Sequence, residues 1–182
     1  MRPPSTPTHQ TERLQLRPGS REDAPALFSA IADPDIVRNL SSAPWPYHLA
    51  DAEALASGAF KPEEPRLFIF LKTSGALIGV AGLDRMSDGE VELGYWIAKA
   101  HWGRGYATEA ARRMIEIATT ELKLERLFAG WFIDNPASGR VLSKLGFVDT
   151  PGLVNRHSRA RGAASPCQMG MLVLDGDLYR EG

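Results

Sequence analysis

The stretch His101-Trp102-Gly103-Arg104-Gly105-Tyr106-Ala107-Thr108-Glu109-Ala110 decides how the chain is organised. The run before it, residues 91–97 (Val-Glu-Leu-Gly-Tyr-Trp-Ile), has the composition of a strand. In the run after it, apolar residues recur every three or four positions, at Ala107, Ala111, Met114, Ala118 and Leu122. That spacing is typical of an amphipathic helix. The two glycines are therefore expected at a strand-to-helix turn.

Such a turn is suited to holding a phosphate or pyrophosphate group. Glycine accepts positive φ and lets backbone approach a ligand closely, and a helix start offers unpaired N–H groups and the positive end of the helix dipole. The alternative is a plain turn in which Gly103 and Gly105 are needed only for steric reasons and no ligand binds. Two other phosphate motifs are excluded, because Thr108 replaces the third glycine of a dinucleotide fingerprint and Gly105-Tyr106-Ala107 is not Gly-Lys-Ser/Thr.

Length and composition narrow the class of protein. With 182 residues, one domain is the default. The net charge of −1 argues against a broad nucleic-acid-binding face. Cys167 is the only cysteine, so no internal disulfide is expected, and the four histidines lack ligand spacing, so no metal is expected. No apolar run approaches the roughly 20 residues that span a bilayer, and no signal peptide is evident, so we expect a soluble cytoplasmic protein.

The remaining elements follow from periodicity and from turn residues. Residues 1–10 are expected to be a flexible tail, and residues 11–182 a single domain. Strands are expected at 14–16, 67–71, 77–83, 91–97, 126–133, 147–148 and 169–174, helices at 24–31, 51–60, 107–122 and 136–145, and a long loop or ragged hairpin at 150–166. Asp23 and Asn135 are the expected helix N-caps, and Gly146 the expected C′ residue. The unit 91–133 implies two parallel strands joined by a helix, beside an antiparallel meander. The fold class is α+β.

Two prolines flank Trp45 in the segment 39–49, which therefore suits neither a helix nor a central strand. We expect a loop that carries Trp45 and Tyr47. Two readings stay open: Trp45 plugs the loop into the core, or the loop forms a wall of a substrate site.

Three segments in this order give the chain a family resemblance. They are residues 11–18 with 21–24, residues 92–97 with 102–110, and residues 135–147 (Asn-Pro-Ala-Ser-Gly-Arg-Val-Leu-Ser-Lys-Leu-Gly-Phe). Together they resemble the GNAT superfamily of acetyl-CoA-dependent N-acetyltransferases, in the branch with the ribosomal-protein N-terminal acetyltransferases (RimJ/RimL-like). The resemblance implies a mixed, mostly antiparallel sheet of about seven strands flanked by helices, in which the fourth and fifth strands run parallel and splay apart around pantetheine.

The resemblance also implies a set of acetyl-CoA contacts. The residues are Ile97, Trp102, Gly103, Arg104, Gly105, Tyr106, Ala107, Thr108, Asn135 and Ser138. Trp102 departs from the Gln or Arg of most of the superfamily, with little consequence where backbone N–H groups hold the pyrophosphate. Asn135 has three open roles: contact with pantetheine, helix capping, or both. His101 and Lys144 are either solvated or close to a CoA phosphate.

The implied chemistry is direct attack of a primary amine on the thioester within a ternary complex. Glu92 is the expected general base and a substrate-binding residue, with a solvent-facing strand carboxylate as the alternative. The superfamily's usual tyrosine acid is replaced by Leu142. Ser138 can donate to sulfur or complete the helix cap. Because Cys167 lies in another segment, no acyl-enzyme is expected.

The expected acceptor is a protein or peptide N-terminus, with Trp45 and Tyr47 as substrate-binding residues and with Arg156, Arg159 and Arg161 on a second wall. One alternative is a small amine, such as a polyamine or an aminoglycoside. Another is a catalytically weak acyl-CoA-binding module. No nucleic acid or membrane partner is expected, and the chain is expected to be a monomer or a homodimer.

Overall fold

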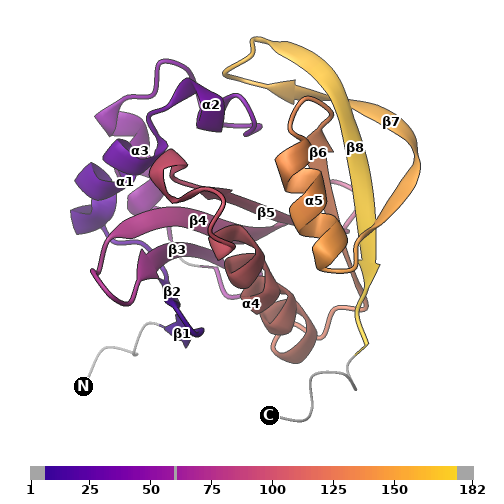
Figure 1. Cartoon of the computed structure of the whole chain (residues 1–182), viewed down its shortest axis with the longest axis horizontal. Coiled ribbons are helices and arrows are strands. Elements are labelled where there is room, and N and C mark those ends of the chain that lie inside the picture. Colours follow the sequence, from indigo (N-terminus) through magenta and orange to yellow (C-terminus); the bar gives the residue numbers. More distant parts are fainter. Residues whose placement is uncertain (1–6, 60, 176–182) are drawn as a thin grey trace.

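The computed structural model describes residues 7–59 and 61–175 (Figure 1). Its centre is an eight-stranded sheet with the order β1-β2-β3-β4-β5-β6-β8-β7. The strands are β1 His9–Gln10, β2 Leu14–Arg17, β3 Arg66–Leu71, β4 Leu77–Arg85, β5 Val91–Ile97, β6 Arg126–Phe132, β7 Val148–Ser158 and β8 Ala163–Val173. The helices are α1 Ala24–Ile31, α2 Pro34–Val37, α3 Leu49–Ala56, α4 Tyr106–Thr120 and α5 Pro136–Lys144, with short 3-10 turns at Arg21–Asp23 and Lys99–His101.

The expected parallel pair is confirmed. Strands β5 and β6 run parallel and share one Cα pairing, Glu92 with Phe128, while every other neighbouring pair in the sheet is antiparallel. Beyond that pairing the two strands diverge. An opening is therefore left in the middle of the sheet.

The sheet has eight strands instead of about seven because the chain pairs before residue 11. His9 pairs with Leu16 and Gln10 with Gln15, and the Thr11 N–H donates to the Leu14 carbonyl to close the hairpin. The assignment of residues 1–10 to a flexible tail is therefore wrong for His9 and Gln10. Their pairing is made by backbone groups, which leave no apolar pattern in the sequence. Residues 1–6 lie outside the described part.

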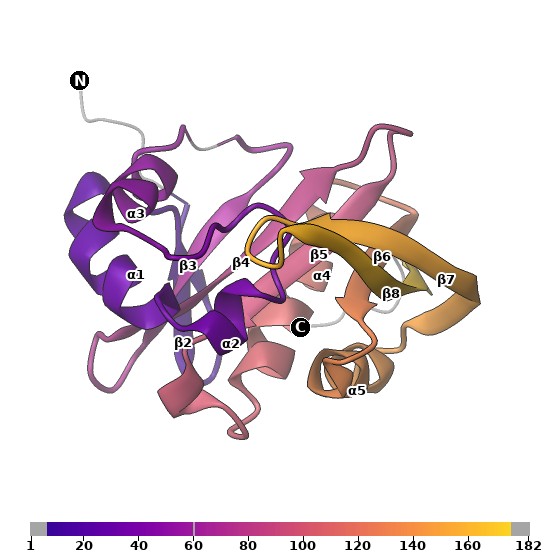
Figure 2. The same ribbon diagram turned by 90° about the horizontal axis from the view of Figure 1, so that it is seen from above.

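The segment expected to be a long loop or ragged hairpin is a long hairpin. β7 and β8 pair in register from Leu153 to Ser158, with a shift between Asp149 and Leu153, where Pro151 and Gly152 interrupt the ladder. β7 is an edge strand with mostly exposed side chains, so it lacks apolar alternation. Figure 2 shows the hairpin crossing over the sheet toward α2.

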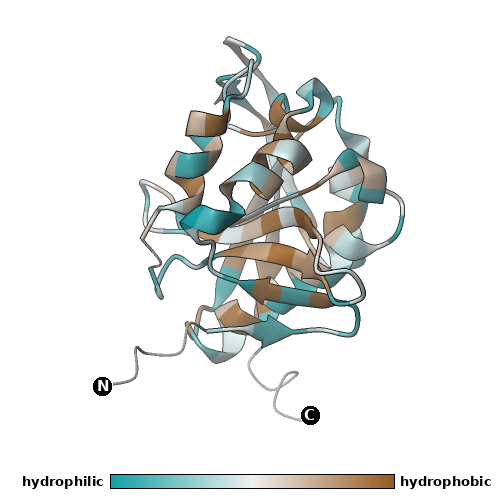
Figure 3. Ribbon diagram, turned by 90° about the vertical axis from the view of Figure 1, so that its left-hand side faces the viewer, coloured by the Kyte–Doolittle hydropathy of each residue, from teal (hydrophilic) through white to brown (hydrophobic). Residues whose placement is uncertain are grey.

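The sheet separates two apolar clusters. One cluster contains Ala110, Met114 and Ala118 of α4 with Leu93 and Leu127 of the central strands, and the other lies under α1 and α3. Met114 is fully buried, and burial of such a side chain stabilises the fold by roughly 1.5–3 kcal/mol. Figure 3 shows hydrophobic residues along the central strands and hydrophilic residues on outer helix surfaces.

The ends of helices α1, α3 and α5 agree in part with the expected boundaries. The Asp23 side chain does not cap α1; it accepts hydrogen bonds from Ser20 and Arg17 instead. Helix α3 begins at Leu49, earlier than expected, and ends at Ala56. Gly146 lies just after α5 with φ +91, as expected for C′. Among the described residues, no helix is long and apolar enough to cross a membrane.

Candidate active site between the splayed strands

A cavity of about 480 Å³ occupies the opening between β5 and β6. On the α4 and α5 side its wall contains Tyr95, Ile97, His101, Trp102, Gly103, Gly105, Tyr106, Ala107, Thr108, Asn135 and Ser138. On the α1 and α2 side it contains Ile36, Asn39, Leu40, Ser41, Glu92, Gly94, Trp96, Phe132 and Arg156. Side chains of a strand alternate between the two faces of a sheet, so Glu92 and Tyr95 reach the cavity from opposite faces. The cavity therefore passes through the sheet.

The glycine turn forms one end of the cavity. Gly103 has φ +72 and Gly105 has φ +79, which is the left-handed region that favours glycine. Gly105 is the N-cap of α4 and provides no side chain to cap it. The first N–H groups of α4 are thus left for a ligand, and the turn has the form that an anion site needs.

Arg13, from the β1–β2 hairpin, braces this turn. Its guanidinium donates to the Arg104 carbonyl (2.9 Å) and to Glu109 (2.7 Å), and it stacks on the Tyr106 ring at 4.6 Å. Glu109 also accepts from the Thr11 hydroxyl at 2.6 Å. Burial alone would raise the pKa of Glu109, but these hydrogen bonds and the charge of Arg13 hold its pKa below the ordinary value.

We expect Arg13→Ala to weaken CoA binding by about 3- to 10-fold, although Arg13 is outside the cavity lining. Loss of charge-assisted hydrogen bonds, worth roughly 1.5–3 kcal/mol in favourable cases, would loosen the turn. Calorimetry on the folded variant measures the change. Arg126→Ala is the matched control, because Arg126 forms an exposed ion pair with Glu90 away from the turn. If the wild-type protein, Arg13→Ala and Arg126→Ala bind CoA with equal affinity, the contacts of Arg13 with the turn are dispensable for binding.

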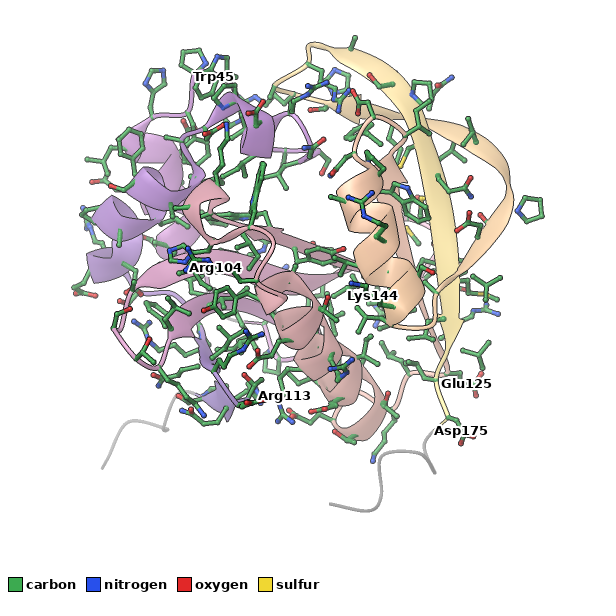
Figure 4. All side chains as sticks on the ribbon, in the orientation of Figure 1. Trp45, Arg104, Arg113, Glu125, Lys144 and Asp175 are labelled. Atoms are coloured by element: carbon green, nitrogen blue, oxygen red, sulfur yellow. The ribbon has the colours of Figure 1, made fainter. Side chains whose placement is uncertain are left out.

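Two of the expected acetyl-CoA residues have particular positions. The Trp102 indole donates to the Ile97 carbonyl (2.6 Å), which ties the turn to the end of β5. Arg104 is exposed and does not line the cavity. Figure 4 shows it near the start of α4. The other expected acetyl-CoA residues all line the cavity.

Ser138 and Asn135 face the cavity instead of capping their helix. Asn135 is the N-cap residue of α5, but its side chain makes no cap hydrogen bond. The Ser138 hydroxyl lies 3.0 Å from the Tyr95 hydroxyl, which also donates to the Ser138 carbonyl at 3.3 Å. Burial raises the pKa of Tyr95 to about 12, opposed in part by the Ser138 contact.

Glu92 is held in a bidentate ion pair with Arg156. One guanidinium nitrogen donates to Oε2 at 2.8 Å and the other to Oε1. The hydrogen bond to Glu92 is the main reason that the pKa of Arg156 is raised. Arg156 crosses β6 at Gly130, where a Cβ would lie 2.8 Å from Arg156 Nη1 and 2.7 Å from Met169 Sδ. The ion pair therefore depends on a glycine in β6.

The expectation that Cys167 lies in a segment away from the site is wrong. Pairing of β8 with β6 places Cys167 opposite Phe132 and at the cavity wall. Burial raises the pKa of its thiol. Since the thiolate is the nucleophile, a buried neutral thiol does not favour a covalent route. The absence of an acyl-enzyme stays a prediction.

The tip of the β7–β8 hairpin docks on the end of α2. Ser158, which is fully buried, donates to the Leu40 carbonyl at 2.9 Å. Arg161 donates to the Arg38 carbonyl (2.7 Å) and forms a bidentate pair with Asp134 (2.8 Å each). Arg156 and Arg161, two of the three arginines expected on the second wall, thus bind partners within the chain, and a contact of this wall with an acceptor stays a prediction.

Trp45 and Tyr47 do not line the cavity. Trp45 is 46% exposed, and Figure 4 shows it at the outer surface near the N-terminal helices. It therefore does not plug the core. Tyr47 is buried in the cluster under α1 and α3 instead. The expected aromatic wall is not formed by these two residues in this structure.

The sequence reasoning missed Tyr95 and Arg13 as site residues. A signal for Tyr95 was present, because it follows Glu92 by three positions on a strand and so must face the opposite side of the sheet. Arg13 had no local signal, since its partners are 91 and 96 residues away. Within residues 7–59 and 61–175, no group of three His, Cys, Asp or Glu side chains is arranged to hold a metal ion.

Comparison with known proteins agrees with this geometry. Residues 13–148 match the acetyltransferase (GNAT) domain. The uncharacterized N-acetyltransferase p20 of Bacillus licheniformis is 29% identical over 161 residues, which are 85% of this chain and 89% of that protein. A solved acetyltransferase from Agrobacterium tumefaciens str. C58 is 30% identical with a TM-score of 0.71, over 92% of this chain and 95% of the other.

A third relative has a named acceptor. The ribosomal-protein-serine acetyltransferase of Escherichia coli (strain K12) is 29% identical over 85 residues, 46% of this chain and 47% of that protein. The domain match covers most of the chain and includes both the glycine turn and the segment that opens α5. The chain therefore belongs to the GNAT family of acetyltransferases.

Proposed function

We propose that this acetyltransferase moves the acetyl group of acetyl-CoA directly to a primary amine, within a ternary complex. The observation that carries the proposal is the cavity through the sheet, with the glycine turn on the α4 side and the Glu92 carboxylate on the α1–α2 side. The donor and the acceptor can then approach the same point from opposite faces. That arrangement suits direct attack and needs no enzyme nucleophile.

The turn is suited to the donor. The N–H groups at the start of α4, together with the positive-φ glycines, fit the pyrophosphate of CoA. The edges of β5 and β6 that face the opening offer backbone groups to the pantetheine arm. A backbone N–H at such an edge can stabilise the oxyanion that forms when the amine attacks.

Glu92 is suited to the acceptor amine. Arg156 occupies two of the positions at which a carboxylate accepts hydrogen bonds, and about two more stay available for an incoming ammonium group. We propose that Glu92 binds and orients this group and takes its proton, directly or through water. Arg156 keeps the carboxylate in place.

A protein or peptide N-terminus is the acceptor that we favour. Each carboxylate that lines the cavity is ion-paired: Asp35 with Lys99, Asp84 with Arg66, and Glu92 with Arg156. Paired charges do not create the negative field that would attract a polycation such as a polyamine. The name of the Escherichia coli relative, a ribosomal-protein-serine acetyltransferase, supports the same choice.

Release of free thiol from acetyl-CoA tests both parts of the proposal. The acceptors are short peptides with free N-termini, spermidine and an aminoglycoside, and kcat/KM for a peptide is expected to be the highest. If a small amine is preferred by about tenfold or more, equivalent to roughly 1.4 kcal/mol in transition-state binding, the peptide acceptor is wrong. If CoA binds but no amine releases thiol, the chain is an acyl-CoA-binding module instead.

A further inference from the structure

Tyr95 and Ser138 connect the two walls of the cavity on the α4–α5 side. Tyr95 comes from β5 and Ser138 from the first turn of α5, and their hydroxyl oxygens are 3.0 Å apart. Along β5, Tyr95 lies between Glu92 and Ile97, whose carbonyl is tied to the glycine turn through Trp102. The two hydroxyls are thus between the phosphate end of the cavity and the carboxylate.

We propose that Tyr95 is a positioning residue which, through Ser138, stabilises the CoA thiolate as it leaves. The inference rests on the proposed function, since it assumes that acetyl-CoA occupies the cavity with its phosphates at the glycine turn. It assigns the two faces of the sheet to different tasks. Glu92 binds the amine and takes its proton on one face, and the hydroxyl pair stabilises the sulfur on the other.

The hydroxyl pair can adopt two hydrogen-bond arrangements. In the first, Ser138 donates to the Tyr95 oxygen while the phenol donates to the Ser138 carbonyl, 3.3 Å away. In the second, the phenol donates to Ser138 Oγ and the Ser138 proton turns toward the cavity. A negative sulfur favours the second arrangement, because each donor in a chain of hydrogen bonds polarises the next. Without the phenol, Ser138 loses the donor that orients it.

The pair supplies hydrogen bonds and keeps its own protons. With a pKa of about 12, Tyr95 holds its proton far more tightly than an ordinary thiol, whose pKa is about 8.5. In the reaction a C–N bond forms, the C–S bond breaks, and its electron pair goes to sulfur. The ammonium group loses two protons in all: the first passes to Glu92 or water before the attack and goes on to solvent, and the second, lost after the C–N bond forms, balances the proton that the thiolate finally takes up. Neither hydroxyl has to ionise.

Titration of the bound CoA thiol tests the inference without any acetyl transfer. CoA labelled with an isotope at the carbon next to sulfur is bound to the wild-type protein and to the Tyr95→Phe and Ser138→Ala variants, and NMR follows the thiol against pH. The thiol pKa is expected to rise by about 1–2 in Ser138→Ala, as loss of a hydrogen bond to a charged group predicts, and by a smaller amount in Tyr95→Phe, which acts through Ser138. Neither substitution replaces any other ionisable side chain that lines the cavity. These side chains include Glu92, His101, Arg140, Lys144, Arg156 and Cys167.

Thr119→Val is the matched control. Thr119 has a buried hydroxyl that donates to the Ile115 carbonyl on α4, on the same side of the sheet but outside the cavity lining. It loses a hydroxyl without touching the pair, so the thiol pKa is expected to match the wild type. A rise in this control equal to that of Tyr95→Phe would show a general effect of packing and overturn the inference.

Kinetics supply an independent readout. Tyr95→Phe is expected to lower kcat by about 5- to 20-fold with little change in the dissociation constant for CoA. The double variant with Tyr95→Phe and Ser138→Ala should have the same kcat as the Ser138→Ala single variant, because Tyr95 acts through Ser138. An unchanged thiol titration in a Tyr95→Phe variant that binds CoA normally overturns the inference. Failure of the wild-type protein to bind CoA overturns the proposed function instead.

Discussion

Replacing Gly105 with Val is expected to weaken CoA binding by at least about 100-fold while the domain stays folded. Gly105 has φ +79, and a branched side chain there is strained whatever the space around it. Its Cβ would also lie 3.4 Å from Arg13 Nη2, against the group that braces the turn. A shift of the turn removes several backbone donors from the pyrophosphate at once. Calorimetry with CoA and with acetyl-CoA measures the loss.

The matched control for Gly105→Val is Gly75→Val. Gly75 has φ +71 in the turn between β3 and β4, and a Cβ at this position would have nothing within 4 Å of it. Both variants carry a similar backbone penalty, roughly 1–2 kcal/mol, but only one disturbs the site. CoA affinity close to that of the wild-type protein in the Gly105 variant would place the pyrophosphate elsewhere.

Replacing Glu92 with Gln is expected to lower kcat/KM by about 100-fold, at the lower end of the usual contribution of a general base. A neutral amide cannot take the amine proton, and it holds Arg156 less firmly than a carboxylate does. Affinity for CoA should change by less than about threefold, because Glu92 and the glycine turn lie on opposite faces of the sheet. Steady-state kinetics and calorimetry on the same preparation separate the two effects.

Glu90→Gln controls for loss of an Arg–carboxylate pair. Glu90 precedes β5 and forms a bidentate pair with Arg126, outside the cavity lining. Its substitution should leave turnover within about twofold of the wild-type value. A Glu92→Gln variant with wild-type turnover at every pH would remove Glu92 from the mechanism.

Much of the fold was predictable because its signals are local. The positive-φ turn at Gly103 and Gly105 lies where a two-residue apolar period changes to a 3.6-residue period, and Asn135-Pro136 and Gly146 mark the two ends of α5. Each of these signals depends on the backbone preference of one residue or on the spacing of a short run. The splay of the two strands beside that turn, where the cavity lies, was implied only by the family resemblance.

The partners of the site residues were decided by the tertiary structure. Arg156 is 64 residues from Glu92, Tyr95 is 43 from Ser138, and Arg13 is 96 from Glu109. A charged or hydroxyl side chain carries no mark of its distant partner in its own stretch of sequence. Register and hairpin length decide which pair forms, because a shift of one residue turns a side chain to the other face of the sheet.

The loop before α3 shows the same limit. Trp45 and Tyr47 are two positions apart in a segment without regular structure, so no period says which one faces inward. The packing of α1 and α3 buries Tyr47 and leaves Trp45 at the surface. The sequence by itself therefore determined the family, through the resemblance of three segments, and the parallel pair and the positive-φ glycine turn, through local backbone preferences. Only the tertiary structure decided that Arg156 holds Glu92 and that Tyr95 holds Ser138, because both contacts join segments that meet only when the sheet has formed.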